Sequence, residues 1–433
     1  MFRNRRERRA KELADANAAA GFAAGKRWEA THDVEDLDAA LDCFNAWHAW
    51  SLTTFVPRNR RAVADSVRGF LLVTRGQIRD DLTDLDDGLA SLATAMDGPE
   101  LSDRERASCQ RSQITGMWAR ATLTDRPADY DQPIALCDAA TPAVLDSTFL
   151  CLMLLSRHNL TGDLADLERA RALFDGHEAD RRSAGLGTAS AALTTHGQLL
   201  LNSYTRYGEP SDAISGIEVL SEAISDADDD GRRDALELTL VALHGERAAR
   251  EGDHDARTHA VTLGESVVAR DVPGKLGVFA LIQLADNLVE RDGPGDTDRA
   301  LVIVDDISGR TGLTALQQGM LRCVSGAARL ARYRSDGDAA DLGRATEDYE
   351  RALEPLTPEF RPFRALALAG YAACLEQPSD QPPAREVLMT ARSAVDEAVE
   401  LTLASECPYP DRIALRERID ATLLHEQSSW RRS

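Results

Sequence analysis

The sequence predicts an all-α fold, in the form of an extended array of helical hairpins. The composition is the first observation, because aromatic residues make up only 5% of the chain while helix-favouring Ala, Leu and Arg are abundant. A repeated sequence pattern is the second, and apolar stripes of helical period are the third. At 433 residues the chain is long for a single compact core, which favours either several domains or one elongated array.

A short Asp-rich pattern recurs along the chain. The stretch "RDDLTDLDDGLASL" at 79–92 is matched by "LTGDLADLERARAL" at 160–173, "SDGDAADLGRATEDY" at 335–349 and "THDVEDLDAALDCF" at 31–44. The residue after the last aligned Asp serves as an anchor. The anchors, weaker copies included, are Leu37, Leu85, Tyr130, Leu167, Ala213, Ala256, Thr297 and Leu342. Their spacing of 37 to 48 residues suits one helical hairpin per repeat.

A second landmark falls in the same register. A glycine lies sixteen residues before four of the anchors, at Gly21, Gly69, Gly197 and Gly326. Since the two landmarks are independent residue types, their common spacing indicates a true repeat. We therefore divide the chain into a basic N-terminal segment (1–14), a repeat array (15–400) and a C-terminal capping helix and tail (401–433).

Each repeat is expected to hold two helices, the first ending before the Asp-rich turn and the second beginning at the anchor. In 312–333 the apolar residues are spaced by three and four, which places them on one face of a helix. The following helix, from Leu342 to Leu353, shows the same spacing. The intervening aspartates can accept from free backbone N–H groups at the start of the second helix and suit the positive end of its dipole.

Charge and cysteine content exclude several classes of protein. The net charge of −22 argues against a general nucleic-acid binder, which needs Lys and Arg to neutralise phosphates. The longest strongly apolar run, 149–155, is far shorter than the roughly 20 residues that a membrane span requires. Seven scattered cysteines, odd in number and without C-x-x-C, are typical of reduced thiols in the cytoplasm.

Two aspartate motifs raise the question of a metal. Asp80, Asp81 and Asp84 fit D-D-x-x-D, with which helical prenyltransferases and terpene cyclases hold magnesium; this would make the chain an all-α magnesium enzyme. A second such triad is not evident, however, and the stretch belongs to the repeat. We therefore expect no catalytic residue and no cofactor.

The stretch 226–237 fits D-x-D-x-D-G-x5-E, the calcium loop of EF-hands. Position eight is Arg233 where an aliphatic residue is usual, and the motif is solitary, so a solvated acidic turn is the favoured interpretation. A calcium-responsive adaptor stays open as an alternative. The candidate ligands are Asp226, Asp228, Asp230, Asp234 and Glu237.

Other short motifs fail or have a structural explanation. "GFAAGKRW" at 21–28 is one residue too short for a P-loop and has Arg27 where Ser or Thr is required. His254 and His259 lie five apart, off the spacing of a zinc helix. Trp47 and Trp50 share a helix face and could anchor a peptide, although capping of the first repeat is the favoured interpretation.

The quoted residues also carry a resemblance to a known family. "LTGDLADLERARALF" and "GAARLARYRSDGDAADLGRATEDYERALEPLTP" resemble the long-period tetratricopeptide repeats that precede the caspase-like CHAT domain in actinobacterial proteins. The resemblance implies a right-handed solenoid of about nine hairpins whose surfaces hold a partner. It implies no peptidase, since only some 30 residues follow the last repeat and Cys407 and His425 do not form the CHAT motifs.

In a tetratricopeptide solenoid the first helices line the concave groove, and here some first helices are basic. An anionic partner would suit such a groove, but pairing of the arginines with acids of the same chain explains the pattern equally well. We expect a non-enzymatic scaffold for a protein or peptide partner, possibly a separately encoded effector. The arginines concerned are Arg58, Arg60, Arg61, Arg68, Arg75, Arg79, Arg310, Arg322, Arg329, Arg332 and Arg334.

Overall fold

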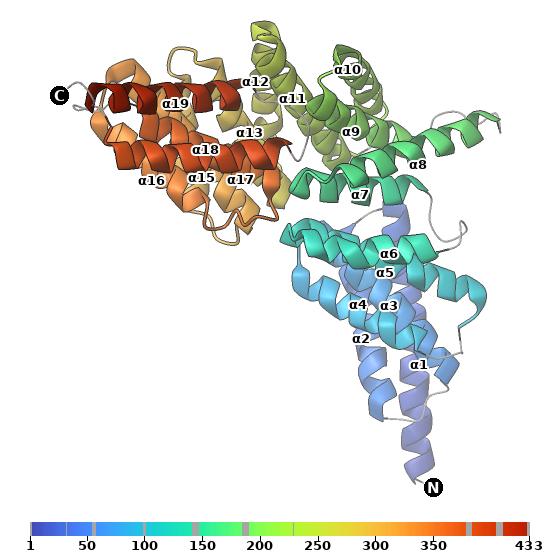
Figure 1. Ribbon diagram of the computed structural model, residues 1–433. Coiled ribbons are helices and arrows are strands. Elements are labelled where there is room, and N and C mark those ends of the chain that lie inside the picture. The colour runs from blue at the N-terminus through green and yellow to red at the C-terminus, as the bar shows by residue number, and fades with distance from the viewer. Residues whose placement is uncertain are drawn as a thin grey trace. The chain divides into compact units, whose positions relative to one another are not determined.

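A computed structural model describes nine stretches of the chain, and within them it confirms the all-α prediction. The described residues are 2–31, 33–53, 58–97, 101–140, 147–183, 190–227, 229–377, 383–403 and 410–430. They form helices joined by short turns and contain no strand. The helices fall into two compact units, Met1–Asp146 and Ser147–Ser433 (Figure 1).

The first unit holds three hairpins. Each hairpin is a first helix and a second helix that pack along each other, α1 with α2, α3 with α4, and α5 with the short η1 and α6. The bounds are α1 Phe2–Thr31, α2 Val34–Thr53, α3 Arg58–Arg79, α4 Leu82–Met96, α5 Asp103–Thr124, η1 Pro127–Tyr130 and α6 Asp131–Ala139.

The second unit holds six hairpins, from α7/α8 to α17/α18, and a last helix that packs on α18. Together with the first unit this makes nine hairpins within the described stretches, in agreement with the expected number of about nine. The bounds are α7 Ser147–Thr161, α8 Leu164–Ser183, α9 Ser190–Tyr207, α10 Pro210–Ser225, α11 Asp230–Glu251, α12 His254–Ala269, α13 Gly274–Arg291, α14 Asp296–Ser308, α15 Ala315–Asp336, α16 Ala339–Ala352, α17 Arg361–Glu376, α18 Arg385–Leu403 and α19 Pro410–Trp430.

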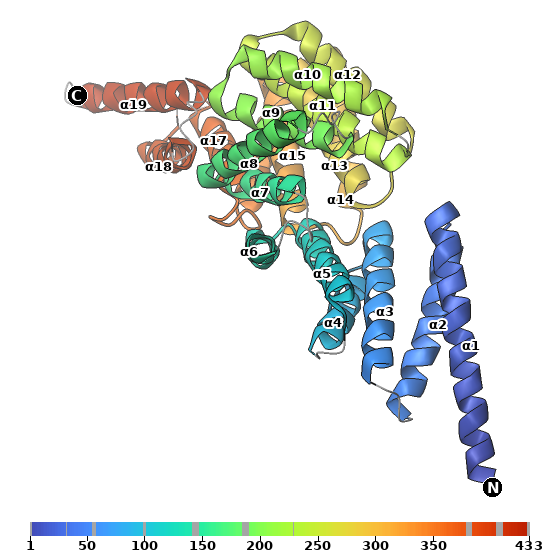
Figure 2. The same cartoon turned by 90° about the vertical axis from the view of Figure 1, so that its right-hand side faces the viewer.

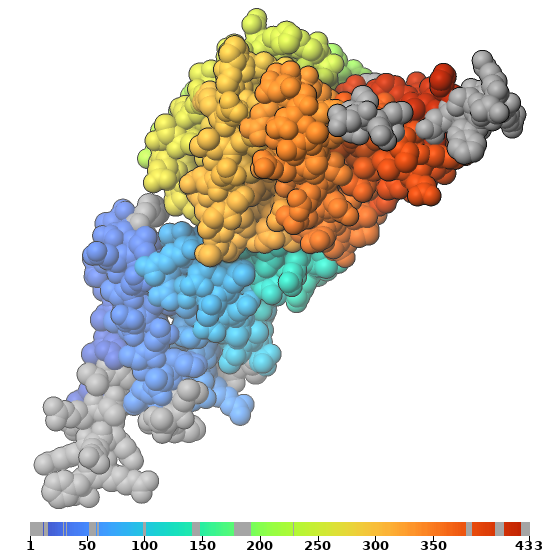
Figure 3. Space-filling model, turned by 90° about the vertical axis from the view of Figure 1, so that its left-hand side faces the viewer, coloured from blue at the N-terminus to red at the C-terminus, as the bar shows by residue number. Residues whose placement is uncertain are grey.

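Within the second unit the hairpins stack as a curved solenoid. Each first helix contacts the first helix of the next hairpin, from α7 to α9 and onward to α17, whereas neighbouring second helices scarcely touch (Figure 2). Because the inner side of a curved stack is the more crowded one, the first helices form its concave layer. In the space-filling view the helices α13 to α17, yellow to orange, form a continuous packed surface (Figure 3).

The repeated glycine leaves space for a large side chain of the neighbouring helix; we call this space the glycine notch. A Cβ atom added to Gly69 would lie 2.6 Å from Cγ of Leu92, and one added to Gly326 would lie 2.8 Å from the Tyr349 ring. Leu92 and Tyr349 each lie seven residues after an anchor, on the second helix of the same hairpin. The glycine therefore lets the two helices of a hairpin approach closely around one buried side chain, as Gly21 and Gly197 also do for Phe44 and Leu220.

The first and last hairpins of the second unit are in contact with each other. Helix α17, the first helix of the sixth hairpin, contacts α7, the first helix of the first hairpin. At this contact a Cβ atom on Gly162 would lie 3.3 Å from Cγ of Pro362. Gly162 also has a positive φ of 67°, which ends α7 in a conformation that favours glycine. Six hairpins thus complete one turn of the stack.

The ends of the array differ from the simplest expectation. Helix α1 begins at Phe2, so the basic segment 1–14 is continuous with the first helix of the first hairpin. The division between Asp146 and Ser147 falls inside the predicted array and was not expected. The outer bounds of the array, 15–400, stay a prediction.

Candidate functional site

The aspartates of the D-D-x-x-D stretch have structural roles. Asp81 is the N-cap of α4, and its carboxylate accepts from the backbone N–H of Thr83 (2.8 Å) and Asp84 (3.4 Å). Asp84 is buried and bound on both oxygens by Arg75, at 2.6 and 2.7 Å. The carboxylates of Asp81 and Asp84 are therefore engaged by groups of the chain itself. The magnesium-enzyme alternative is not supported, and the described residues contain no group of three or more His, Cys, Asp or Glu placed to hold a metal.

The Arg75–Asp84 pair recurs in other hairpins with the same spacing. We use the term turn ion pair for an arginine near the end of a first helix bound to an aspartate nine residues later, in the first turn of the second helix. In three hairpins it is bidentate, with both nitrogen–oxygen distances between 2.6 and 2.7 Å. Five pairs within the described stretches fit this definition, namely Arg27–Asp36, Arg75–Asp84, Arg120–Asp129, Arg157–Asp166 and Arg332–Asp341.

The turn ion pair explains why the repeat keeps an aspartate immediately before its anchor. In hairpin α13/α14 the turn is longer and the arginine is the last residue of its helix, so Arg291 binds Asp296 five residues later, at 2.7 Å on both oxygens. A planar guanidinium that binds a carboxylate with two parallel hydrogen bonds fixes both distance and orientation. The aspartates of the turn and a capping role for them could be predicted from the sequence, and Asp81 fills that role in α4. The arginine was missed, although its regular position nine residues before the paired aspartate is a signal.

The geometry of the described candidate ligands does not support the calcium-loop alternative. Helix α11 begins at Asp230, so the second half of the motif is helical and Gly231 makes no sharp turn. Arg270, the C-cap of α12, binds Asp234 at 2.7 Å and also pairs with Glu237. A calcium loop needs its ligands to converge from a non-helical backbone. Asp226 caps the end of α10, and Asp228 lies outside the described residues.

The two tryptophans belong to the core of the first unit. Trp47 is buried among residues of α1, α2 and α3, and Trp50 packs against the same cluster. Their rings meet edge to face at 6.3 Å. This placement agrees with a role in closing the first hairpin, and it leaves neither ring free to anchor a peptide.

The basic first helices do not present a row of free arginines. Arg68 donates to Asn45 and Ser91, Arg79 pairs with Asp38, and Arg329 pairs with Asp348. Arg75 and Arg332 form turn ion pairs. The structure therefore favours the explanation that these arginines bind groups of the same chain.

A groove opens on the first-helix side of the first unit. Helix α1 packs on α2 but scarcely touches α3, and the two are bridged by the rings of Trp28 and Phe70, 6.3 Å apart. The space beside them has a volume of about 370 Å³. We call it the α1–α5 groove. Its walls are Gly21, Phe22, Gly25, Lys26, Trp28, Phe44, Ser66, Val67, Phe70, Leu71, Ser108 and Ser112.

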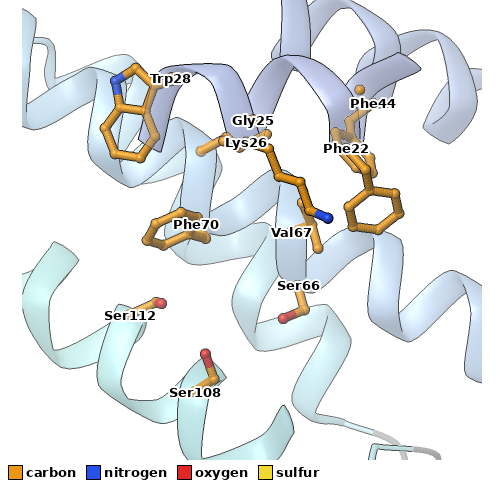
Figure 4. A pocket seen from close by; sticks show the side chains of 12 residues that line it. Phe22, Gly25, Lys26, Trp28, Phe44, Ser66, Val67, Phe70, Ser108 and Ser112 are labelled. Carbon is orange, nitrogen blue, oxygen red and sulfur yellow. The ribbon is translucent and has the colours of Figure 1, made fainter. Parts of the chain in front are cut away.

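The groove is apolar along its walls and polar at one edge. Phe22 and Phe70 are 47% and 39% exposed, which is unusual for rings of this size. Figure 4 shows Lys26 between Trp28 and Phe70 on one side and Phe22 and Phe44 on the other, with three serines along the lower edge. Lys26 is the only charged side chain among the 12 lining residues.

The groove holds binding features but no catalytic set. It has neither a histidine nor a carboxylate, the usual general acids and bases, and its serines have no such neighbour in the lining to activate them. Ser66 accepts from the buried Cys109 thiol at 3.2 Å. Burial is the main reason why the pKa of Cys109 is raised, which keeps that thiol protonated and unreactive.

The second unit has one unusual carboxyl. Asp286 on α13 is accessible to solvent, and desolvation by its surroundings is the main reason why its pKa is raised to about 7. The negative charge of Glu290 raises it further, while Arg257 opposes the shift. Protonation of Asp286 is thus linked to the packing of the concave layer.

Stacked two-helix repeats with glycine notches define the class of this protein, an all-α repeat protein with tetratricopeptide-like hairpins. No known protein family matches the sequence, and no curated protein is similar to it. Among solved structures, a tetratricopeptide repeat protein from Parabacteroides merdae is similar over 81% of this chain and 98% of its own. With 14% identity and a TM-score of 0.30 that overlap is loose, so the assignment follows from the chain's own hairpins.

The described helices also bear on membrane insertion. None of them is both long enough and apolar enough to cross a bilayer.

Proposed function

We propose that this chain is a non-enzymatic interaction scaffold that binds a segment of a partner protein in the α1–α5 groove. The observation that carries the proposal is the pair of exposed rings, Phe22 and Phe70, on opposite walls of a groove without catalytic groups. Apolar side chains of a bound segment would remove these rings from water, which favours association by about 25 cal/mol for each Å² buried.

The rest of the proposal concerns the partner and its location. The partner is proposed to be a separately encoded effector or regulator, in line with the solenoid character of the chain. The protein is proposed to act in the cytoplasm, since the six cysteines within the described stretches are all free thiols. Neither statement depends on the groove: the proposed partner class or the proposed location can be wrong while the groove is still the binding site.

The test begins with capture of partners from the native cells. The tagged full-length protein is purified with and without calcium, and stoichiometric partners are identified by mass spectrometry. The double variant Phe22→Ser/Phe70→Ser is compared with Val302→Ser, which removes an exposed apolar side chain from α14 in the second unit.

We expect a partner that is captured by the wild type and by Val302→Ser, in either calcium condition, and lost with the groove variant. Equal capture by all three proteins would contradict the groove as the binding site. The absence of any stoichiometric partner would count against the scaffold itself. Circular dichroism of each variant controls for loss of fold.

A further inference from the structure

The charge of the α1–α5 groove restricts the chemistry of what it binds. Among the described residues that line it, Lys26 is the single charged one and none carries a carboxylate. Within the described part of the chain the adjacent Arg27 is paired with Asp36 at 2.8 Å, whereas Lys26 makes no ion pair. In a chain of net charge −22, an unpaired cation between aromatic walls is exceptional.

The surroundings of Lys26 strengthen its attraction for an anion. Opposite charges attract more strongly beside low-dielectric protein than in open water. The rings of Phe22 and Trp28 supply such surroundings, since both line the groove with Lys26 (Figure 4). An anionic group bound there would also leave most of its remaining surface facing solvent at the open side.

The serine edge supplies hydrogen-bond donors for the same group. Ser108 and Ser112 lie four residues apart on α5, one helical turn from each other, and both line the groove with Ser66 of α3. Because the Ser66 oxygen already accepts from Cys109, its own hydrogen is directed elsewhere. Hydroxyl donors beside a lysine suit the oxygens of a carboxylate or a phosphate.

We infer that the α1–α5 groove recognises a peptide segment in which an acidic side chain lies next to a bulky apolar one. The acidic group sits at Lys26 and the serine edge, and the apolar side chain packs between Phe22 and Phe70. The acidic group is a carboxylate or a phosphorylated side chain, which share the same anionic oxygens. This inference rests on the proposed function, because it names the chemistry of the segment bound at that site.

The experiment selects peptides from a random library, so the partner need not be identified first. Peptides displayed on phage are enriched on the immobilised full-length protein, and the selection is repeated on Lys26→Gln, Lys26→Glu and Phe70→Ser. Lys275→Gln, which removes a lysine from α13 of the second unit, is the matched control. Enriched peptides are then synthesised, and their affinities are measured by fluorescence anisotropy at low and high salt.

We expect the wild type and Lys275→Gln to enrich Asp or Glu beside a bulky apolar residue. Lys26→Gln should weaken the binding of these peptides about two- to fivefold, the range for an exposed ion pair, and should flatten its salt dependence. Lys26→Glu should move the preference towards Lys or Arg at the acidic position. Phe70→Ser should weaken binding about tenfold or more. A phosphoserine at the acidic position distinguishes a phosphate-preferring groove from a carboxylate-preferring one.

Two other results are distinguishable. If apolar peptides without acidic residues are enriched, and Lys26→Gln and Lys26→Glu bind them as the wild type does, the acidic specificity is wrong while the groove remains a binding site. If no peptide depends on Phe70, the groove itself is not the site, and both this inference and the proposed function are overturned.

Discussion

Arg332 binds Asp341 through two parallel hydrogen bonds, Nε to Oδ2 and Nη2 to Oδ1, each 2.6 Å long. The two residues lie at the junction of α15 and α16, and the Asp341 side chain is only 4% exposed. The pair joins the end of one helix to the beginning of the next. The same pair recurs at a spacing of nine residues in five hairpins of the described stretches.

Removal of this charge should destabilise the hairpin. We expect Asp341→Asn to lower the free energy of unfolding by about 2 kcal/mol, since it leaves a half-buried guanidinium without its carboxylate. Chemical denaturation followed by circular dichroism measures the change. Glu347→Gln is the control, because the exposed pair of Glu347 with Arg351 should contribute less than about 0.5 kcal/mol. Equal changes in the free energy of unfolding would show that the turn ion pair contributes no more than an exposed ion pair.

The same pair predicts how stability changes in acid. The hydrogen bonds from Arg332 are the main reason why the pKa of Asp341 lies below its usual value of 3.8. A depressed pKa stabilises the fold fully above the usual value, and this contribution is lost as the pH falls through the folded pKa. The difference in stability between wild type and Asp341→Asn should therefore be constant near neutral pH and shrink below about pH 4. A constant difference down to pH 2 would contradict this origin.

Asp286 should show the opposite dependence. Its pKa is raised to about 7, chiefly by desolvation, so its contribution to stability is fully present below about pH 4 and is lost as the pH rises through 7. We expect Asp286→Asn to unfold at a higher Tm than the wild type at pH 8 and at the same Tm near pH 4. Thermal melts across this range provide the test, with the exposed Asp305→Asn of α14 as control. A higher Tm at pH 4 as well would indicate improved packing instead.

The glycine notch predicts a position-dependent response to alanine. Gly326→Ala should destabilise the protein by about 1–3 kcal/mol, because its Cβ would press against the Tyr349 ring and the backbone would have to move. Gly343→Ala, on the exposed face of α16 with nothing within 4 Å, should be neutral or stabilising by up to about 1 kcal/mol. Urea denaturation of both variants distinguishes a packing effect from a general effect of helical glycine.

Calcium should have no effect on stability. Because Asp234 and Glu237 are held by Arg270 in a helix, we expect Tm to change by less than about 1 °C between excess calcium and excess chelator. Arg270→Ala should lower Tm in both conditions. A calcium-dependent rise in Tm that Glu237→Ala abolishes would restore the adaptor alternative.

Much of the fold could be predicted because its signals are local. The aspartates before Leu85 and Leu342 repeat at the start of each second helix, and Gly69 and Gly326 repeat in the first. Each reflects a contact within one hairpin, so its spacing is nearly constant along the chain. The turn ion pair is equally local, since Arg75 and Arg332 each precede their aspartate by nine residues. That spacing is visible in the sequence.

The groove could not be predicted, since it depends on how neighbouring hairpins pack. Phe22, Lys26 and Phe70 carry no motif, and their proximity follows from the separation of α1 from α3. The same reason applies to the arginines of the first helices, for which the sequence left a partner-binding surface and pairing within the chain equally open. Their partners on neighbouring helices, such as Asp38 for Arg79, lie far away in sequence.

The contact between Gly162 and Pro362 gives the second unit a resistance to stretching that open repeat proteins lack. An open solenoid can lengthen and shorten like a spring, and evolution can add or delete a hairpin at little cost. In this unit the sixth hairpin rests against the first, so stretching the coil would require that contact to break. An inserted or lost hairpin would displace one of the two surfaces, and the number of repeats is therefore tied to the curvature of the coil.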